Sequence, residues 1–229
     1  MKKELRHPFI EVEGARGVTY GGNQRYSRQN YVKKSGCGVI ASCDLLLYLS
    51  DHRGDCKNGF FADALRDNRL TLEEYNDLAD RLRRHYLPVV PNYGINGFSL
   101  AIGLNAYFMR YKLPFTARWG VGKGRLWSAI DEMLSKDLPV IFSIGNQFPR
   151  FWRKDKLGLY PAPDRENHRH ATATRAHYVT VTAADENWLR ISSWGGEYYI
   201  SKAEYCRFVD EHSNYLFSNI LYLKEKKRG

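Results

Sequence analysis

The sequence has few cysteines, and none of them is spaced for a zinc ribbon or for dithiol redox chemistry. The four stand at positions 37, 43, 56 and 206 of a 229-residue chain, and no two of them form a CxxC pair. Zinc ribbons and dithiol redox motifs require such pairs, so both classes are excluded. In a reducing cytosol we expect all four cysteines to be free thiols.

The sequence also lacks a long apolar run. None reaches the roughly 20 residues of a membrane span, and the basic N-terminus MKKELRHPFIEVEG is not followed by the apolar stretch of a signal peptide. We therefore expect a cytoplasmic protein without membrane insertion. No internal repeat or low-complexity linker interrupts the chain, and its 43% hydrophobic content suffices for a sizeable core. Residues 1–229 are therefore expected to form a single domain.

The sequence has fewer acidic residues than basic ones. The chain has 25 of them against 35 lysines and arginines, which gives a net charge of +10. Such a balance favours anionic partners in general. The basic residues are nevertheless scattered among acidic ones, and no nucleic-acid-binding motif accompanies them, which indicates an ordinary solvated surface. We expect no nucleic-acid partner.

The residues that are present divide the chain into two halves. Residues 37–49 are apolar at almost every position, which predicts a helix buried on nearly all faces. Further helices are expected near residues 71–86, 98–108 and 126–134, and strands near 138–144, 176–183, 188–194, 197–200 and 216–223. The predicted fold class is α+β. A helical half, about residues 20–136, packs on one side of an antiparallel sheet from about residues 137–224.

One segment has no periodicity. Residues 145–175 follow neither helical nor strand spacing, and they end immediately before His177. Unpatterned loops of this length are uncommon and often cover functional sites. Aromatic and basic residues such as Phe148, Trp152 and Arg153 suit contacts with a peptide. We expect a substrate-reading lid, with a plain surface loop as the alternative.

A cysteine stands where the buried helix begins. Cys37 lies between two glycines in the run Ser-Gly-Cys-Gly, and the free amides and dipole of a helix N-terminus favour a thiolate. The other interpretation is a small apolar residue packed at a helix start. By their surroundings, Cys43 and Cys206 are expected to be core thiols, and Cys56 an exposed thiol without a catalytic role.

A histidine begins the alternating strand of the second half. His177 shares a strand face with Val179 and Val181, and the following hairpin ends in the run Ser-Ser-Trp-Gly. A nucleophilic cysteine needs a base within reach and a third group to orient that base. A strand packed on the head of the buried helix would supply this geometry. A structural histidine is the alternative.

These motifs together resemble a known family. Cys-Gly at the head of a buried helix, a distant His-Tyr-Val strand and a Ser-Trp-Gly strand end are similar to the papain-like cysteine peptidases. The similarity is greatest to the bacteriocin-processing (double-glycine) peptidases and to uncharacterised Firmicutes proteins of that group, which share the Gly-Gly-Asn-Gln and Leu-Leu-Leu-Tyr-Leu runs. The resemblance runs from about Tyr20 to Tyr222.

The resemblance implies a papain-like fold and hydrolysis of peptide bonds, with a peptide or protein as substrate and no cofactor. The nucleophile falls on Cys37 and the base on His177. The orienting Asn or Asp of the family falls on Ser192, a departure, since a hydroxyl carries no charge to stabilise an imidazolium. The oxyanion-binding glutamine falls on Gln24, or as second choice on Gln29, which lie thirteen and eight residues before the cysteine.

Three other interpretations stay open. The same Cys–His pair can transfer an acyl group to an amine, as in transglutaminase-like enzymes and acyltransferases. A catalytically decayed relative would keep the fold as a binding protein, which the serine at position 192 favours. A metal site is the third, since His168, His170 and His177 lie near Asp164 and Glu166. Their spacing matches no known zinc motif, so no metal is expected.

Overall fold

The computed structural model describes residues 2–145, 154–163 and 170–226. Its helices are α1 (Asn30–Ser35), α2 (Cys37–His52), α3 (Leu72–His85), α4 (Gly97–Arg110), α5 (Leu126–Ser135) and α6 (Lys202–His212). Short 3-10 turns lie at Gln24–Tyr26, Gly54–Cys56 and Lys123–Arg125.

The strands of the first half are β1 (Lys3–Glu4), β2 (Glu11–Gly14), β3 (Gly17–Tyr20), β4 (Arg69–Thr71) and β5 (Phe115–Trp119). Those of the second half are β6 (Val140–Ile144), β7 (Leu157–Leu159), β8 (Thr172–Thr174), β9 (His177–Ala184), β10 (Trp188–Ser193), β11 (Gly196–Ser201) and β12 (Ile220–Glu225).

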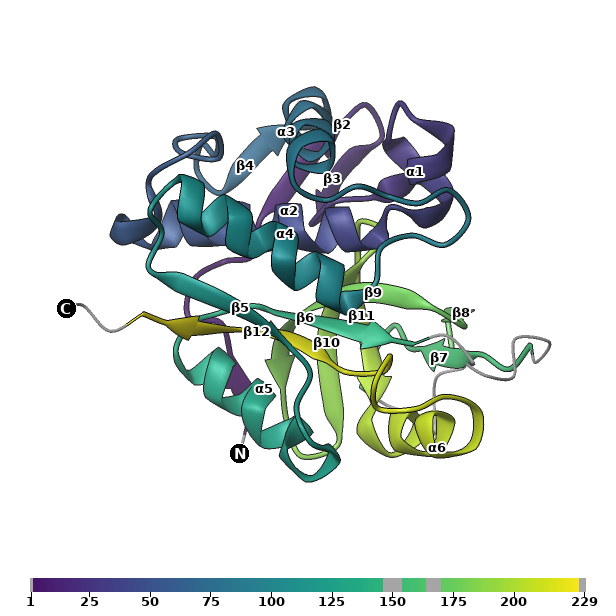
Figure 1. Cartoon of the computed structure of the whole chain (residues 1–229). Helices are drawn as coiled ribbons and strands as arrows, with labels where there is room; N and C mark the ends of the chain where they lie inside the picture. The colour runs from purple at the N-terminus through teal and green to yellow at the C-terminus, as the bar shows by residue number, and fades with distance from the viewer. Residues whose placement is uncertain (1, 146–153, 164–169, 227–229) are drawn as a thin grey trace.

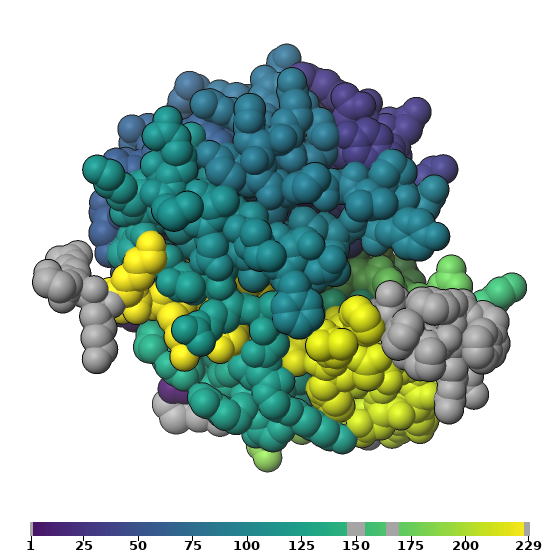
Figure 2. Space-filling model, viewed as in Figure 1, coloured from purple at the N-terminus to yellow at the C-terminus, as the bar shows by residue number. Residues whose placement is uncertain are grey.

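The largest sheet is antiparallel and has seven strands. Its order is β11-β10-β9-β6-β12-β5, and β1 pairs with the end of β9. A second sheet holds β3, β2 and β4, and β7 pairs with β8. Helices together with an antiparallel sheet confirm the predicted α+β class. Figure 2 shows the two halves as surfaces: the N-terminal half, purple to teal, lies above much of the yellow C-terminal segment.

Helices cover both faces of this sheet, whereas the sequence predicted them on one side. Figure 1 shows α2 and α4 above the sheet and α5 and α6 below it. The reason is the apolar character of the central strands: every residue of β6 is buried. A strand that is apolar on both faces must be covered on both faces. The division into halves is also approximate, because β1 and β5 come from the first half.

Helix α2 is the centre of the molecule. All residues from Gly38 to Ser50 are buried, as predicted from a run without a polar face. A helix of this kind must be enclosed by other elements, and α3 packs on it from one side and β9 and β6 from the other. The residue at its N-terminus is therefore held close to the first residues of β9.

The two helix starts with Ser/Thr-x-x-Glu spacing differ in detail. At α3, Thr71 Oγ1 accepts a hydrogen bond from the Glu74 amide at 3.2 Å, and the Glu74 carboxylate accepts one from the Thr71 amide at 2.8 Å. This is a complete capping box. At α6 only the serine half is present, because the Glu204 carboxylate instead accepts hydrogen bonds from the Tyr160 hydroxyl at 2.9 and 3.0 Å.

Part of the segment predicted as a structureless loop is ordered. Strands β7 and β8 form a hairpin, and Tyr160 bridges to Tyr199 of β11 by backbone hydrogen bonds of 2.9 and 2.8 Å. The segment is thereby joined to the edge of the large sheet. The residues named for the predicted lid, Phe148, Trp152 and Arg153, lie outside the described residues.

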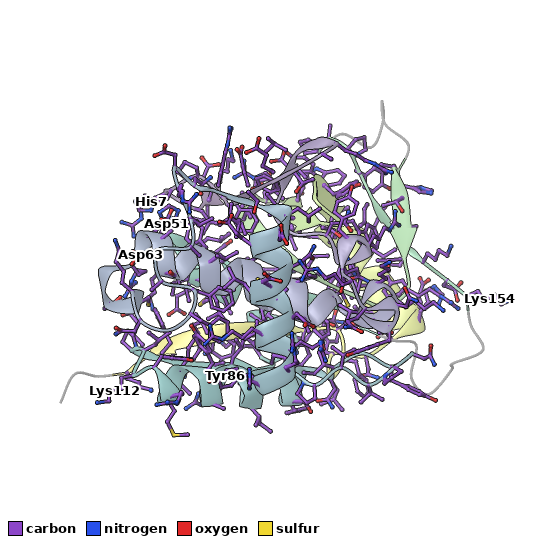
Figure 3. The ribbon with its side chains drawn as sticks, turned by 90° about the horizontal axis from the view of Figure 1, so that it is seen from above. His7, Asp51, Asp63, Tyr86, Lys112 and Lys154 are labelled. Carbon is purple, nitrogen blue, oxygen red and sulfur yellow. The ribbon has the colours of Figure 1, made fainter. Side chains whose placement is uncertain are left out.

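The N-terminal segment is fixed at the far end of α2. His7 Nδ1 lies 2.6 Å from Asp137 Oδ2, and the His7 ring stacks on His52 with centroids 4.5 Å apart. The other carboxylate oxygen of Asp137 accepts hydrogen bonds from the Arg6 amide and the Tyr48 hydroxyl. Figure 3 shows His7 and Asp51 on the same side of the molecule, away from Lys154.

Candidate active site

The structure brings Cys37 and His177 together although 140 positions separate them. Cys37 is the first residue of α2 and His177 the first residue of β9. Both line a cavity of about 220 Å³ at the boundary between the two halves. The juxtaposition arises because α2 packs along β9, so that the head of the helix and the start of the strand meet.

The cavity walls come from five parts of the chain. The lining residues are Lys34, Ser35, Cys37, Asn92, Tyr93, Gly94, Ile95, Asn96, Ser143, Ile144, Gly145, Ala176, His177, Tyr178 and Phe217. Among these described residues only Lys34 is permanently charged. The cavity therefore offers apolar and neutral polar surface around a single thiol and a single imidazole.

The imidazole of His177 is held on two sides. Its Nε2 lies 2.8 Å from the Ser193 hydroxyl oxygen, and the ring stacks on Trp194 with centroids 4.4 Å apart and planes 20° apart. The side chain is 7% exposed. With Nε2 engaged by Ser193, Nδ1 is the nitrogen left for proton exchange with a substrate or a thiol.

The orienting hydroxyl belongs to Ser193, so the assignment to Ser192 is wrong. Ser192 donates its hydroxyl to the Tyr20 carbonyl at 2.9 Å and does not reach the histidine. In the sheet Ser192 pairs with Thr180, and paired residues share a face. Because successive side chains alternate, Ser193 takes the face shared by Val179 and His177. The alternation of side chains along this strand could be read from the sequence, whereas the register of its pairing with β9 could not.

Trp194 owes its position to a tight turn. Trp194 and Gly195 join β10 to β11 and have φ of 49° and 76°. Two successive residues with positive φ are typical of a type I′ hairpin turn. A tryptophan in the left-handed region is unusual, and here its ring is the surface on which His177 rests. The Arg25 guanidinium lies 5.5 Å from the Trp194 ring centroid.

Burial sets the protonation of both groups. It raises the pKa of Cys37 above its usual value of 9, although hydrogen bonds from the backbone amides of Tyr178 and Gly38 work in the opposite direction. Burial, with a smaller contribution from the charge of Arg25, lowers the pKa of His177 to about 3. Burial thus disfavours the thiolate that the sequence predicted at the helix N-terminus, and it favours the neutral form of both groups, because desolvation outweighs the helix terminus.

Of the two glutamines considered for the oxyanion site, the structure brings only Gln24 to the cysteine. Gln24 is buried and lines a small cavity of about 10 Å³ together with Cys37 and His177. One N–H of its amide donates to the Lys33 carbonyl at 3.0 Å, which fixes the side chain. Gln29 is exposed at the start of α1 and makes no cap with its side chain.

The remaining cysteines differ from expectation in two cases. Cys43 is fully buried in α2, as predicted. Cys56 was expected to be exposed, but it is 1% exposed because the Gly54–Cys56 turn packs under the end of α2. Cys206 was expected in the core and is only partly buried. Cys206 is thus the thiol whose exposure compares with that of Cys37.

The described residues contain no group of three histidine, cysteine or acidic side chains placed to hold a metal ion. Of the residues considered for a metal site, Asp164, Glu166 and His168 lie outside the described part of the chain. Within that part no helix is long and apolar enough to cross a membrane. No protein-family model and no curated protein matches this sequence.

Sequence reasoning gave no role to three residues that build the site, although they lie in the runs Gly-Gly-Asn-Gln and Ser-Ser-Trp-Gly. Ser193 and Trp194 hold His177, and the Asn23 side chain donates to the Trp194 carbonyl at 2.7 Å. The signal for Ser193 was present in the period-two pattern. No local signal marks Asn23, because its partner lies 171 residues further along the chain.

Proposed function

We propose that the chain is a cysteine peptidase with a papain-like fold, in which Cys37 attacks a peptide carbonyl and His177 exchanges the proton. The observation that supports this most directly is the shared cavity. A thiol at a helix N-terminus and an imidazole with one nitrogen hydrogen-bonded line the same space from two distant segments. This is the arrangement of nucleophile, base and orienting group that thiol hydrolases need.

The reaction begins from a neutral pair. Because burial disfavours both charged forms, the Cys37 proton passes to His177 Nδ1 as the sulfur bonds to the carbonyl carbon. The imidazolium formed then gives this proton to the leaving amine when the C–N bond breaks, which leaves a thioester on Cys37. Water, deprotonated by the same nitrogen, cleaves the thioester and restores the thiol.

The carbonyl oxygen becomes negatively charged in the first step and needs donors. The Cys37 amide at the head of α2 is one, since the first amides of a helix have no partner within it. The Gln24 amide is the second: one of its two N–H groups is used by the Lys33 carbonyl, which leaves the other for the oxyanion.

The walls of the cavity favour an uncharged stretch of peptide. Ile95, Tyr178 and Phe217 supply apolar surface, and Lys34 lies at the rim as an exposed cation. A side chain buried there would be apolar, and an acidic residue nearby in the substrate would meet the lysine.

The proposal is tested by Cys37→Ala and His177→Ala against the parent protein, with Cys206→Ala as the matched control, because both sulfurs are partly buried. A peptide library is scored for cleavage by mass spectrometry, and a thiol-directed electrophilic probe is located by intact mass and peptide mapping. We expect loss of cleavage by roughly 10³-fold or more in the two site variants. We expect no loss in Cys206→Ala.

Two results would reject the peptidase. One is cleavage that survives Cys37→Ala. The other is a probe that labels Cys37 no faster than Cys206 at every pH from 6 to 10. If the acyl group formed on Cys37 were released by added amines and not by water, the chain would be an acyltransferase.

A second candidate is a binding protein of the same fold without catalysis. Two observations favour it: the group beside His177 is a hydroxyl without charge, and burial lowers the pKa of His177 to about 3. Such a protein would bind peptide from the library without cleaving it. Equal affinity of the parent and Cys37→Ala proteins for an uncleaved peptide would identify this case.

A further inference from the structure

A buried carboxylate lies on the same helix as Cys37, seven residues further along. Asp44 is 1% exposed. Its Oδ1 accepts hydrogen bonds from the Tyr75 hydroxyl at 2.6 Å and from the Gly22 amide at 3.1 Å. A carboxylate is costly to bury without such partners. The partners come from two different elements, helix α3 and the loop of residues 21–24.

This loop is held tightly against the carboxylate. A Cβ added at Gly21, whose φ is 72°, would lie 2.7 Å from Asp44 Oδ2 and 2.3 Å from Ser192 Oγ. A Cβ at Gly22 would lie 1.9 Å from the Tyr75 hydroxyl oxygen. Only glycine permits the backbone to approach this closely. Glycine at positions 21 and 22 therefore allows the loop to contact Asp44 and Tyr75.

The same loop carries two contacts into the candidate active site. Asn23 donates its side-chain amide to the Trp194 carbonyl, and the Trp194 ring is the one stacked on His177. The next residue is Gln24, which shares the small cavity with Cys37, His177 and Asp44. The carboxylate of Asp44 is thus joined through one short loop to both sides of the Cys–His pair.

We infer that Asp44 is a positioning residue of this site, which holds residues 21–24 so that Gln24 meets the oxyanion and Trp194 supports His177. The inference deepens the proposed function and rests on it for its catalytic meaning. The ionised carboxylate is the form that holds the loop, since a charged acceptor binds the Gly22 amide and the Tyr75 hydroxyl more strongly than a neutral one.

The carboxylate of Asp44 titrates in a pH range in which its neighbours do not. Burial, opposed by the hydrogen bonds from Tyr75 and Gly22, raises the pKa of Asp44 to about 7. The titratable groups around it in the neighbouring elements are Cys37 and Cys43 of α2, Tyr75 of α3, Tyr20 of β3, and His177 and Tyr178 of β9, and burial raises the pKa of Tyr178 as it does that of the other tyrosines.

None of these neighbours titrates near neutrality. The pKa of each cysteine and tyrosine is raised from 9 or 10, and that of His177 is lowered to about 3. A change in the site between pH 6 and 8 is therefore assigned to Asp44.

The first test follows the loop directly by NMR of the parent protein. An amide proton hydrogen-bonded to a carboxylate shifts when that carboxylate titrates. We expect the Gly22 backbone amide and the Gln24 side-chain amide to shift with one common midpoint between pH 6 and 8. Both titrations should be absent in Asp44→Asn, because the amide oxygen of asparagine still accepts hydrogen bonds but the side chain does not titrate. Both should persist in Asp51→Asn, which makes the same change near the C-terminus of α2.

The second test uses turnover. In the parent protein kcat should fall as pH drops below about 7, Asp44→Asn should lack this limb, and Asp51→Asn should retain it. Asp44→Ala should lose roughly tenfold or more in kcat with a smaller change in KM, because the loop is displaced and peptide binding is not. Thermal melts establish that each variant is folded.

The two tests separate the inference from the proposed function. If no peptide is cleaved, the NMR titrations alone decide whether Asp44 controls the loop. The inference is overturned if Gly22 titrates and Gln24 does not follow. It is equally overturned if Asp44→Asn keeps the pH dependence of the parent protein in turnover or in chemical shift.

Discussion

Histidines lie at both ends of α2, two at the tail and one at the head, in opposite surroundings. At the tail, His7 stacks on His52 and pairs with the carboxylate of Asp137, and its side chain is 50% exposed. At the head, His177 is buried against Trp194, and its ring nitrogen lies beside the hydroxyl of Ser193. The tail gives its histidine a carboxylate partner and solvent, whereas the head buries its histidine beside a neutral hydroxyl.

The difference separates a contact that stabilises the fold from the contact of the candidate base. The hydrogen bonds of Asp137 to Tyr48, Arg6 and His7 outweigh its burial and lower the pKa of this carboxyl, which is how a paired acid stabilises a fold. His177 has no acid hydrogen-bonded to it within the described residues, and burial keeps it neutral. A neutral imidazole has a lone pair that can accept a proton, but burial disfavours the protonated form, so this histidine lowers the stability of the fold in acid.

The largest effect expected from this comparison is on acid stability. Because the folded pKa of His177 is about 3 and the ordinary value is 6.5, the contribution of the neutral ring is complete above pH 6.5 and is lost as pH falls toward 3. The loss is about 1.4 kcal/mol per pH unit, up to roughly 5 kcal/mol in all. The difference in unfolding free energy between the parent protein and His177→Gln, measured by urea denaturation from pH 7 to 4, should show this slope. Parallel curves would contradict the assignment.

The next largest expected effect is the loss of stability when the Asp137 carboxylate at the tail of α2 is removed. Asp137→Ala leaves the Arg6 amide and the Tyr48 hydroxyl without their acceptor, so we expect a destabilisation of about 2–3 kcal/mol. Since the folded pKa of Asp137 lies below its usual 3.8, the difference should persist at neutral pH and disappear only below about pH 4.

Glu73→Ala is the control for this variant. Glu73 forms an exposed ion pair with Arg28, and such pairs contribute at most about 1 kcal/mol. Urea denaturation at pH 7 compares the two variants. Equal losses would mean that Asp137 acts as an ordinary surface charge.

The smallest expected effect is on the pKa of His177, when this histidine at the head of α2 is given an acidic neighbour like the one beside His7 at the tail. Ser193→Asp places a carboxyl beside His177 Nε2, and an ionised neighbour favours the imidazolium, so we expect the pKa of His177 to rise by about one to two units. Histidine ring signals in NMR titrations measure it. Ser192→Ala should leave this pKa unchanged, because Ser192 bonds to Tyr20. A larger shift in Ser192→Ala than in Ser193→Asp would restore the original assignment.

Which elements form was readable from the sequence where the chain has strong periodicity. The helices at residues 37–49, 71–86, 98–108 and 126–134 and the long strands of the second half lie within a few residues of the prediction. The strands β1 to β5, β7 and β8 were missed, because two to five residues carry too short a period to be recognised and gain their hydrogen bonds from partners elsewhere in the sequence.

The nucleophile and base positions were also proposed from local pattern and the family resemblance, and the structure places Cys37 and His177 in one cavity. The protonation of both and the choice of Ser193 were not predictable in this way. Their protonation follows from burial, and the choice of hydroxyl follows from the register that pairs Ser192 with Thr180. Neither quantity is defined until the strands are paired and the helix is covered.

The sequence by itself determined the buried helix and the alternating strand, with a cysteine at the start of one and a histidine at the start of the other, since periodicity and turn residues act locally. Tertiary structure alone decided that Asp44 meets the Gly22 amide and that the loop of residues 21–24 meets Trp194. Those contacts join elements whose separation along the chain is long, and only the packing of α2 against β9 and α3 brings them within hydrogen-bonding distance.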